Sequence, residues 1–301
     1  MFIIKFRKVF FALSVVLIGL SVWAMFHYGL NFGIDFKGGS IVEVSYPAGR
    51  PVITALRSSI DTLNIGGYTL QPVGEKNFVL RTRELNQQEK EVVKTALSLN
   101  GASPVTEERF NTVGPAVGQD MRTKAFTAII VVMLGIVLFV TYAFRKVSQP
   151  VASWKYGLAT IIALAHDVLI PTGVFIIYAH FRTGEIDMLF VSALLAILGY
   201  SVHDTIVVFD RVRENLKLSH MTKNKSTFTE IVGASVTQTF ARSINTSLTI
   251  FLVLLSLYVI GGEATRNFSF VLLVGIIAGT YSSIFIASPL LVVMEKWQKK
   301  S

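Results

Sequence analysis

The sequence predicts an α-helical polytopic membrane protein with six transmembrane helices and one small α+β domain outside the bilayer. The chain is 52% hydrophobic and only 16% charged, which is too apolar for a soluble domain of 301 residues. Six apolar runs reach the length of about 20 residues that a membrane helix needs. One polar region separates the first two runs, and its hydrophobic pattern is that of short strands and helices.

The six expected spans are 9–28, 125–144, 154–179, 188–209, a fifth that ends near Ile260, and 268–294. The fifth can start anywhere between Ile231 and Ile244, because Arg242 interrupts its hydropathy. The first span follows a basic segment, as in a signal peptide, but no small-residue cleavage site closes it. We therefore expect an uncleaved anchor.

The net charge of +9 is distributed as membrane topology requires. On a six-span model, fourteen Lys and Arg residues and four acidic residues fall on one face, an excess of +10. The short loops on the opposite face carry only Arg182 and Arg266 as basic residues. The positive-inside rule then places both termini in the cytoplasm, and the charge needs no nucleic-acid partner.

Residues 29–123 form the expected outside domain, between the first span (1–28 with the N-terminus) and the five-helix region 124–301. The expected elements are a strand at 41–46, a helix at 51–64, strands at 68–73 and 78–83, a helix capped by Asn86 and closed by Gly101, and a strand at 104–110. This βαββαβ order is the split βαβ, ferredoxin-like arrangement. The arrangement hosts many functions and so names none.

Asp204 is the residue that points most directly to function, because it lies inside an otherwise apolar span and follows His203. A carboxylate at membrane depth costs roughly 2.5 to 3.5 kcal/mol on insertion scales, so it normally faces protein or water and marks an ion path. Transport is therefore the first hypothesis. The alternative is a neutral carboxylic acid that only hydrogen-bonds a neighbouring helix.

A second His-Asp pair, His166-Asp167, lies in the third span before Pro171. A metal site or a hydrolase centre would need further ligands, and the chain has no Cys, so we expect no metal, no cofactor and no enzymatic activity. Asp167 is expected to line the polar interior or to bond a neighbouring helix near Pro171. The small residues Gly275, Gly279 and Ser283 of the sixth span are expected to serve helix packing.

Two Gly-rich stretches flank the outside domain, 33–40 and 113–120. Neither has the spacing of a phosphate-binding loop. Hinges or close-packed connectors are the better interpretation.

Three motifs give the chain a family resemblance. They are GIDFKGG from Gly33 to Gly39, Val113-Gly114-Pro115, and GYSVHDTIVVFDRVREN from Gly199 to Asn215. Together they resemble the SecF branch of the SecD-SecF family of bacterial protein export, which belongs to the RND class of proton-driven transporters. The resemblance runs nearly end to end and includes the six spans and the single outside domain. The residues that match the first two motifs, Gly33, Asp35, Gly38, Gly39, Gly114 and Pro115, have structural or hinge roles in this interpretation.

The resemblance implies a subunit of the inner membrane that works with SecD and uses the proton motive force to assist export through SecYEG, after SecA has used ATP. Further partners would be YajC and the unfolded secretory polypeptide. The family's transport residues match Asp204 and Arg242, with His203, Asp167 and Thr246 as accessory candidates.

Arg242 also stands on a helical stripe with Gln238, Thr246 and Thr249, which the spacing places on one face. It is either a deep partner of Asp204 or an interfacial cation, depending on where the fifth helix starts.

Two other functions remain open at this stage. An RND-type exporter half for lipids or small molecules would need a second six-span partner, and a scaffold with satisfied buried polar groups would not transport at all. The presence of a SecD partner would distinguish protein export from the exporter half. Neutralising Asp204 would distinguish protein export from the scaffold.

Overall fold

The computed structural model describes residues 2–145, 151–182, 184–222 and 226–298. The chain forms two compact units. The helical unit comprises Met1–Leu30, Thr127–Gly184 and Leu189–Ser301, and the sheet unit comprises Asn31–Phe126 and Glu185–Met188.

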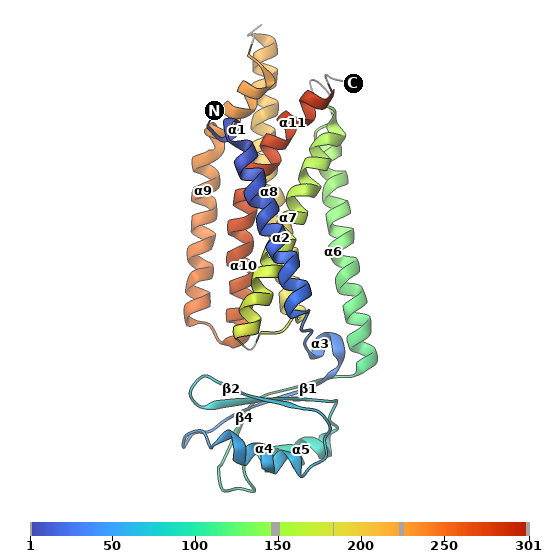
Figure 1. Cartoon of the computed structure of the whole chain (residues 1–301), viewed down its shortest axis with the longest axis vertical. Helices are drawn as coiled ribbons and strands as arrows, with labels where there is room; N and C mark the ends of the chain where they lie inside the picture. The colour runs from blue at the N-terminus through green and yellow to red at the C-terminus, as the bar shows by residue number, and fades with distance from the viewer. Residues whose placement is uncertain (1, 146–150, 183, 223–225, 299–301) are drawn as a thin grey trace. The chain divides into compact units, whose positions relative to one another are not determined.

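The helical unit is a bundle whose helices run side by side, with the two chain termini at the same end (Figure 1). Its helices are α1 (Phe2–Lys5), α2 (Arg7–Tyr28), α6 (Pro115–Ala143), α7 (Ser153–Phe181), α8 (Met188–Met221), α9 (Phe228–Ile260), α10 (Glu263–Ser282), the π-helix η1 (Ser283–Ala287) and α11 (Ser288–Gln298). Six helical stretches of the described chain are long and apolar enough to cross a membrane, and the last, Thr265–Trp297, joins α10, η1 and α11. The six-span prediction is confirmed.

Helix α7 packs against both α2 and α10, so it lies at the centre of the bundle. Small residues let these helices approach closely, because a Cβ atom added at Gly173 of α7 would overlap Ser21 of α2. On α10, added Cβ atoms at Gly275 and Gly279 would meet Ile197 and Ser201 of α8. The predicted packing role of these two glycines is confirmed.

The fifth helix starts three residues before the early end of the range expected for its span. Helix α9 begins at Phe228, because the Thr227 hydroxyl accepts from the Glu230 backbone amide and Glu230 caps the Thr227 amide in return. A prediction based on hydropathy alone does not detect this capping box, because its residues are polar. With 33 residues α9 is about 50 Å long, longer than the roughly 30 Å hydrocarbon core of a bilayer.

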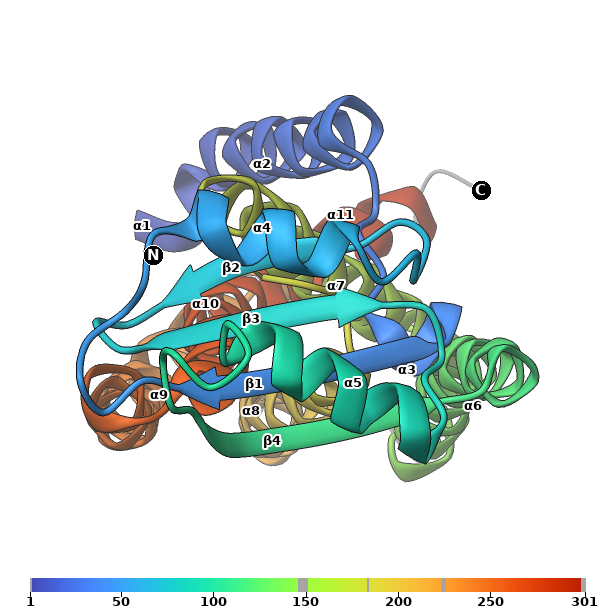
Figure 2. The same cartoon turned by 90° about the horizontal axis from the view of Figure 1, so that it is seen from below.

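The sheet unit has the predicted element order. It consists of β1 (Gly39–Ser45), α4 (Ile53–Asp61), β2 (Thr69–Val73), β3 (Asn77–Thr82), α5 (Gln87–Leu97) and β4 (Thr106–Val113), after the short helix α3 (Ile34–Lys37). The strand order is β2-β3-β1-β4 and every neighbouring pair is antiparallel. This is the ferredoxin-like topology expected from the sequence, with α4 and α5 on one face of the sheet (Figure 2).

The core of the sheet unit lies between that face and the two helices. Alternate strand residues such as Val42 and Leu80 meet Leu56 of α4 and Val93 of α5, and all four are buried. Tyr46 is buried with them, and its hydroxyl donates to the Leu97 carbonyl oxygen at 2.9 Å. Burial raises the pKa of Tyr46 to about 12.

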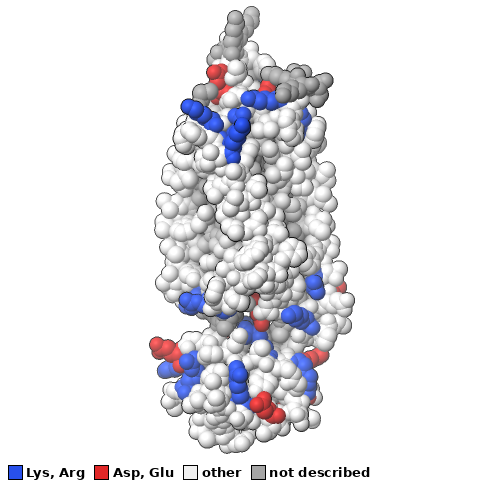
Figure 3. Space-filling model, in the orientation of Figure 1, with Lys and Arg blue, Asp and Glu red and all other residues white. Residues whose placement is uncertain are grey.

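Basic side chains gather at the end of the helical unit that carries both termini, and a broad uncharged band follows along the helices (Figure 3). An uncharged band between charged ends is the pattern that a bilayer imposes. Of the fourteen basic residues assigned to this face, Lys146, Lys223, Lys225, Lys299 and Lys300 lie outside the described residues.

Candidate functional site

Asp204 lies in the interior of the bundle, where three helical elements meet. It is 7% exposed, and its two carboxyl oxygens accept hydrogen bonds from different serines. Ser243 of α9 donates to Oδ1 at 2.6 Å, and Ser283 of η1 donates to Oδ2. Both contacts are hydroxyl groups, which can donate to a carboxylate or accept from a carboxylic acid.

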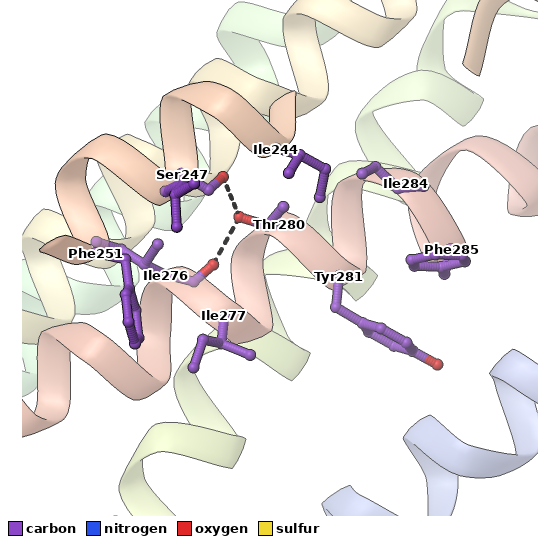
Figure 4. A pocket seen from close by; sticks show the side chains of 10 residues that line it. Ile244, Ser247, Phe251, Ile276, Ile277, Thr280, Tyr281, Ile284 and Phe285 are labelled. Atoms are coloured by element: carbon purple, nitrogen blue, oxygen red, sulfur yellow. Dashed lines mark hydrogen bonds between the residues drawn. The ribbon is translucent and has the colours of Figure 1, made fainter. Parts of the chain in front are cut away.

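A line of hydroxyls continues from Asp204 along the face that α9 turns to the bundle. Ser243 and Ser247 are four residues apart and share this face. The Ser247 hydroxyl lies 2.6 Å from the hydroxyls of both Tyr200 and Thr280. Ser247 and Thr280 lie beside a cavity of about 290 Å³, whose other lining is mostly apolar (Figure 4).

Asp167 forms a second buried carboxylate centre between α7, α8 and α10. It is fully buried, and its Oδ2 accepts from Ser201 and, at 2.7 Å, from Ser282. Its Oδ1 lies 2.8 Å from Nδ1 of His166, which donates when that nitrogen carries the proton. The expectation that Asp167 bonds neighbouring helices is confirmed.

His166 is 1% exposed and stacks on Tyr281, with ring centroids 5.8 Å apart and planes 17° apart. Its Nε2 is buried and has no hydrogen-bond partner among the described residues. The Tyr281 hydroxyl donates to the Phe10 carbonyl oxygen of α2 at 2.8 Å. Tyr281 therefore contacts both His166 of the second centre and the backbone of helix α2.

The two carboxylate centres share one local feature, the start of the π-helix η1. Ser282 and Ser283 are consecutive residues there, and they bond Asp167 and Asp204 respectively. Single π-helical turns inside α-helices are rare and often occur at functional sites. Ser283, which was expected to serve helix packing, is fully buried and also bonds Asp204.

Arg242 lies at the depth of Asp204, since it precedes Ser243, but it is on the exposed face of α9. Gln238, Thr246 and Thr249 share that exposed face, as the stripe predicted. Arg242 makes no hydrogen bond or ion pair with the described part of the chain. Its pairing with Asp204 stays a prediction.

His203 also lies on an exposed face, that of α8, while Asp204 beside it points inward. The structure therefore brings Asp204 together with Ser243 and Ser283, and leaves His203, Arg242 and Thr246 outside the bundle. The serines were missed because serine in a membrane helix usually bonds its own backbone, as Ser247 does to the Ser243 carbonyl oxygen at 2.7 Å. The four-residue spacing of Ser243 and Ser247 was the sequence signal for this face of α9.

In the described residues, no three His, Asp or Glu side chains gather closely enough to hold a metal ion.

The two Gly-rich stretches pack against each other in the sheet unit. Gly38 has a φ of 78°, and a Cβ atom added to it would lie 2.7 Å from Cα of Pro115 beside Gly114. Gly39 has a φ of 129° and lies against the Thr82 carbonyl oxygen.

The first stretch is also tied to the segment before α8. The Gly33 amide donates to the Ile186 carbonyl oxygen at 2.9 Å, and the Asp35 carboxylate accepts from the Met188 amide at 2.9 Å. Such packing suits a close-packed connector.

Comparison with known proteins gives matches over nearly the whole chain. The family model described as "Protein export membrane protein SecD/SecF, C-terminal" matches residues 92–297, and the "SecD/SecF GG Motif" model matches residues 23–46. A protein translocase subunit SecF from Thermobaculum terrenum is 39% identical over 99% of this chain and 94% of its own length. A SecF from Calditerrivibrio nitroreducens is 36% identical over 97% of this chain and 93% of its own length.

Among solved structures, SecDF from Thermus thermophilus, a translocon-associated membrane protein, matches with a TM-score of 0.83 and 32% identity. The match covers 97% of this chain and 38% of that chain. A second SecDF structure, in a super-membrane-facing form, matches with a TM-score of 0.68 and 32% identity, over 99% of this chain and 39% of that chain.

Proposed function

This chain belongs to the SecD/SecF protein-export family, and from that membership we propose that it is the SecF-type subunit of an export machine driven by the proton motive force. The observation that carries the proposal is the buried carboxylate of Asp204 on a membrane-spanning helix, held by Ser243 and Ser283. A titratable group at this depth marks an ion path.

Asp204 is proposed to bind and release the transported proton. In its ionised form the carboxylate accepts from both serines, and in its protonated form it donates its own hydrogen to one of them. Moving one elementary charge through about 100 mV makes roughly 2.3 kcal/mol available. That energy is enough to shift a two-state equilibrium by a factor of about fifty.

SecD is the proposed partner, and the polar stripe on α9 supports this choice. Gln238, Arg242, Thr246 and Thr249 are exposed on a membrane-spanning helix. Lipid tails cannot solvate a guanidinium group, so the stripe needs protein or water beside it. The solved relatives named SecDF carry further chain beyond the part that this protein matches.

The remaining assignments follow from the same proposal. The protein resides in the cytoplasmic membrane with both termini inside and residues 29–123 outside, as the basic end of the helical unit supports (Figure 3). It acts with SecYEG, SecA and YajC on an unfolded secretory polypeptide, as a transporter subunit without enzymatic chemistry of its own.

The test is proton-gradient-dependent export in vesicles that contain this protein, SecD, SecYEG and SecA. Asp204→Asn keeps the size of the side chain but cannot carry the proton, so we expect it to abolish the stimulation by the gradient. Asp210→Asn is the matched control, because Asp210 is an exposed carboxylate on the same helix. Full stimulation in the Asp204→Asn variant would refute the proposal.

A further inference from the structure

The carboxylate of Asp167 is more deeply buried than that of Asp204, yet the proposed transport cycle gives it no role. Its three neighbouring polar groups are Ser201, Ser282 and His166, all from the bundle interior. In the described residues no Lys or Arg pairs with Asp167, and a fully buried carboxylate is costly unless its charge is compensated or it can also exist in the neutral form.

The serines at the start of η1 can satisfy either protonation state, because each has a second acceptor. The Ser282 hydroxyl lies 2.7 Å from Oδ2 of Asp167 and 3.1 Å from the Gly279 carbonyl oxygen. The Ser283 hydroxyl bonds Oδ2 of Asp204 and lies 3.0 Å from the Thr280 carbonyl oxygen.

A hydroxyl carries one hydrogen, so each serine donates to only one of its two acceptors at a time. When the carboxylate is ionised, the serine donates to it. When the carboxylate gains a proton, the new O–H bond donates to the serine oxygen, and the serine turns its hydrogen to the helix carbonyl. Each serine hydroxyl therefore keeps a partner in either state.

We propose that Asp167 is a second proton-binding carboxylate of this protein, switched by Ser282 in the way that Ser283 switches Asp204. The proposal extends the proposed export function, on which it rests, from one proton site to two. The two switching serines are adjacent residues at the start of η1.

The groups that influence Asp167 come from each helix packed around it. His166 on its own helix can hold a proton at Nδ1, Tyr281 of α10 stacks on that imidazole, and Asp204 of α8 lies beyond Ser283. Two carboxylates in one low-dielectric interior disfavour being ionised together.

Infrared difference spectroscopy on the full chain in lipid vesicles tests the proposal, with the buffer exchanged between acidic and alkaline pH. A protonated buried carboxylic acid gives a C=O band that moves in D₂O. We expect this band to contain two components, one lost in Asp167→Asn and the other in Asp204→Asn. An Asp167→Asn band identical to that of the wild type would overturn the proposal.

Ser282→Ala is a milder variant that also tests the switch. Removing one donor from the ionised carboxylate should raise its ratio of protonated to ionised form by roughly tenfold at a given pH. Ser288→Ala is the matched control, because within the described chain the Ser288 hydroxyl bonds the Ser283 carbonyl oxygen, at 2.9 Å, and no carboxylate. Equal spectra for the two serine variants would remove Ser282 from the mechanism.

The export and infrared measurements test the proposed function and the second proton site separately. If Asp204→Asn keeps gradient-driven export, the proposed function fails while the infrared result for Asp167 still stands. If Asp167→Asn leaves the band unchanged while Asp204→Asn loses export, only the second proton site fails.

Discussion

Arg242 and Ser243 are neighbours on α9, yet only Ser243 reaches the buried carboxylate of Asp204. Ser243 is 1% exposed and donates at 2.6 Å, whereas Arg242 lies on the exposed face. Successive residues of an α-helix point about 100° apart, so α9 presents a hydroxyl to the interior and a cation to its surroundings at one depth. An ion pair between Arg242 and Asp204 needs a rotation of α9 or a bridging group from a partner.

We predict that Arg242→Met inactivates gradient-dependent export as strongly as Asp204→Asn. The double variant should be no worse than either single variant, because residues that act as a unit are non-additive. The measurement is export in vesicles that contain SecD and each variant.

Arg182→Met is the control for loss of a basic side chain, since Arg182 is exposed beyond the end of α7. Residual activity in both single variants, with losses that multiply in the double variant, would mean that the two residues work independently.

The close approach of the Gly-rich stretches gives a stability prediction. Gly38→Ala should lower the free energy of unfolding by about 3 kcal/mol or more, because its φ is 78° and the new Cβ would meet the Pro115 backbone. Gly66→Ala is the control, since Gly66 has a φ of 81° and a Cβ atom added to it would meet no described atom within 4 Å beyond its chain neighbours. It should cost only about 1 kcal/mol from backbone strain. Equal losses of apparent melting temperature in the two variants would show that the contact with Pro115 is unimportant.

Local sequence patterns were enough to predict the sheet unit. Alternation marks β1 and β3, and the Asn86 cap marks α5. In the helical unit, hydropathy located every span but not the start of α9. Arg242 interrupts the apolar run, whereas the helix begins earlier, at the capping box of Thr227.

The site was only half predictable for a different reason. An isolated carboxylate such as Asp204 is conspicuous in an apolar span, whereas serines are common in membrane helices and acquire a role only from the helix they face. The contacts of Ser282 and Ser283 depend on the π-turn η1, which leaves no mark in composition or spacing.

The cap of α5 gives a pH-dependent prediction. Glu89 bonds Arg83 and the Asn86 amide, and these bonds lower the pKa of Glu89 from 4.5 to about 2. A lowered folded-state pKa adds stability above pH 4.5, and this stability is lost as the pH falls toward 2. In Glu89→Gln, amides of the first turn of α5 should therefore exchange faster than in the wild type at neutral pH. The difference should disappear as the pH falls through that window.

Hydrogen–deuterium exchange of both full-length proteins at each pH measures this effect. Glu91→Gln controls for the loss of one negative charge, because Glu91 is an exposed residue of the same helix. A difference that persists unchanged at the lowest pH would assign the effect of Glu89 to packing rather than charge.

The last prediction concerns membrane orientation, which the basic end of the helical unit indicates through the positive-inside rule. The chain has no cysteine, so a single Cys reports on its own position. Thr62→Cys, at the exposed C-cap of α4, should react with a membrane-impermeant thiol reagent in intact spheroplasts. Lys217→Cys, at an exposed position near the end of α8, should react only after the membrane is broken. Labelling in the reverse order would place the sheet unit in the cytoplasm, where it could not meet a polypeptide leaving the membrane.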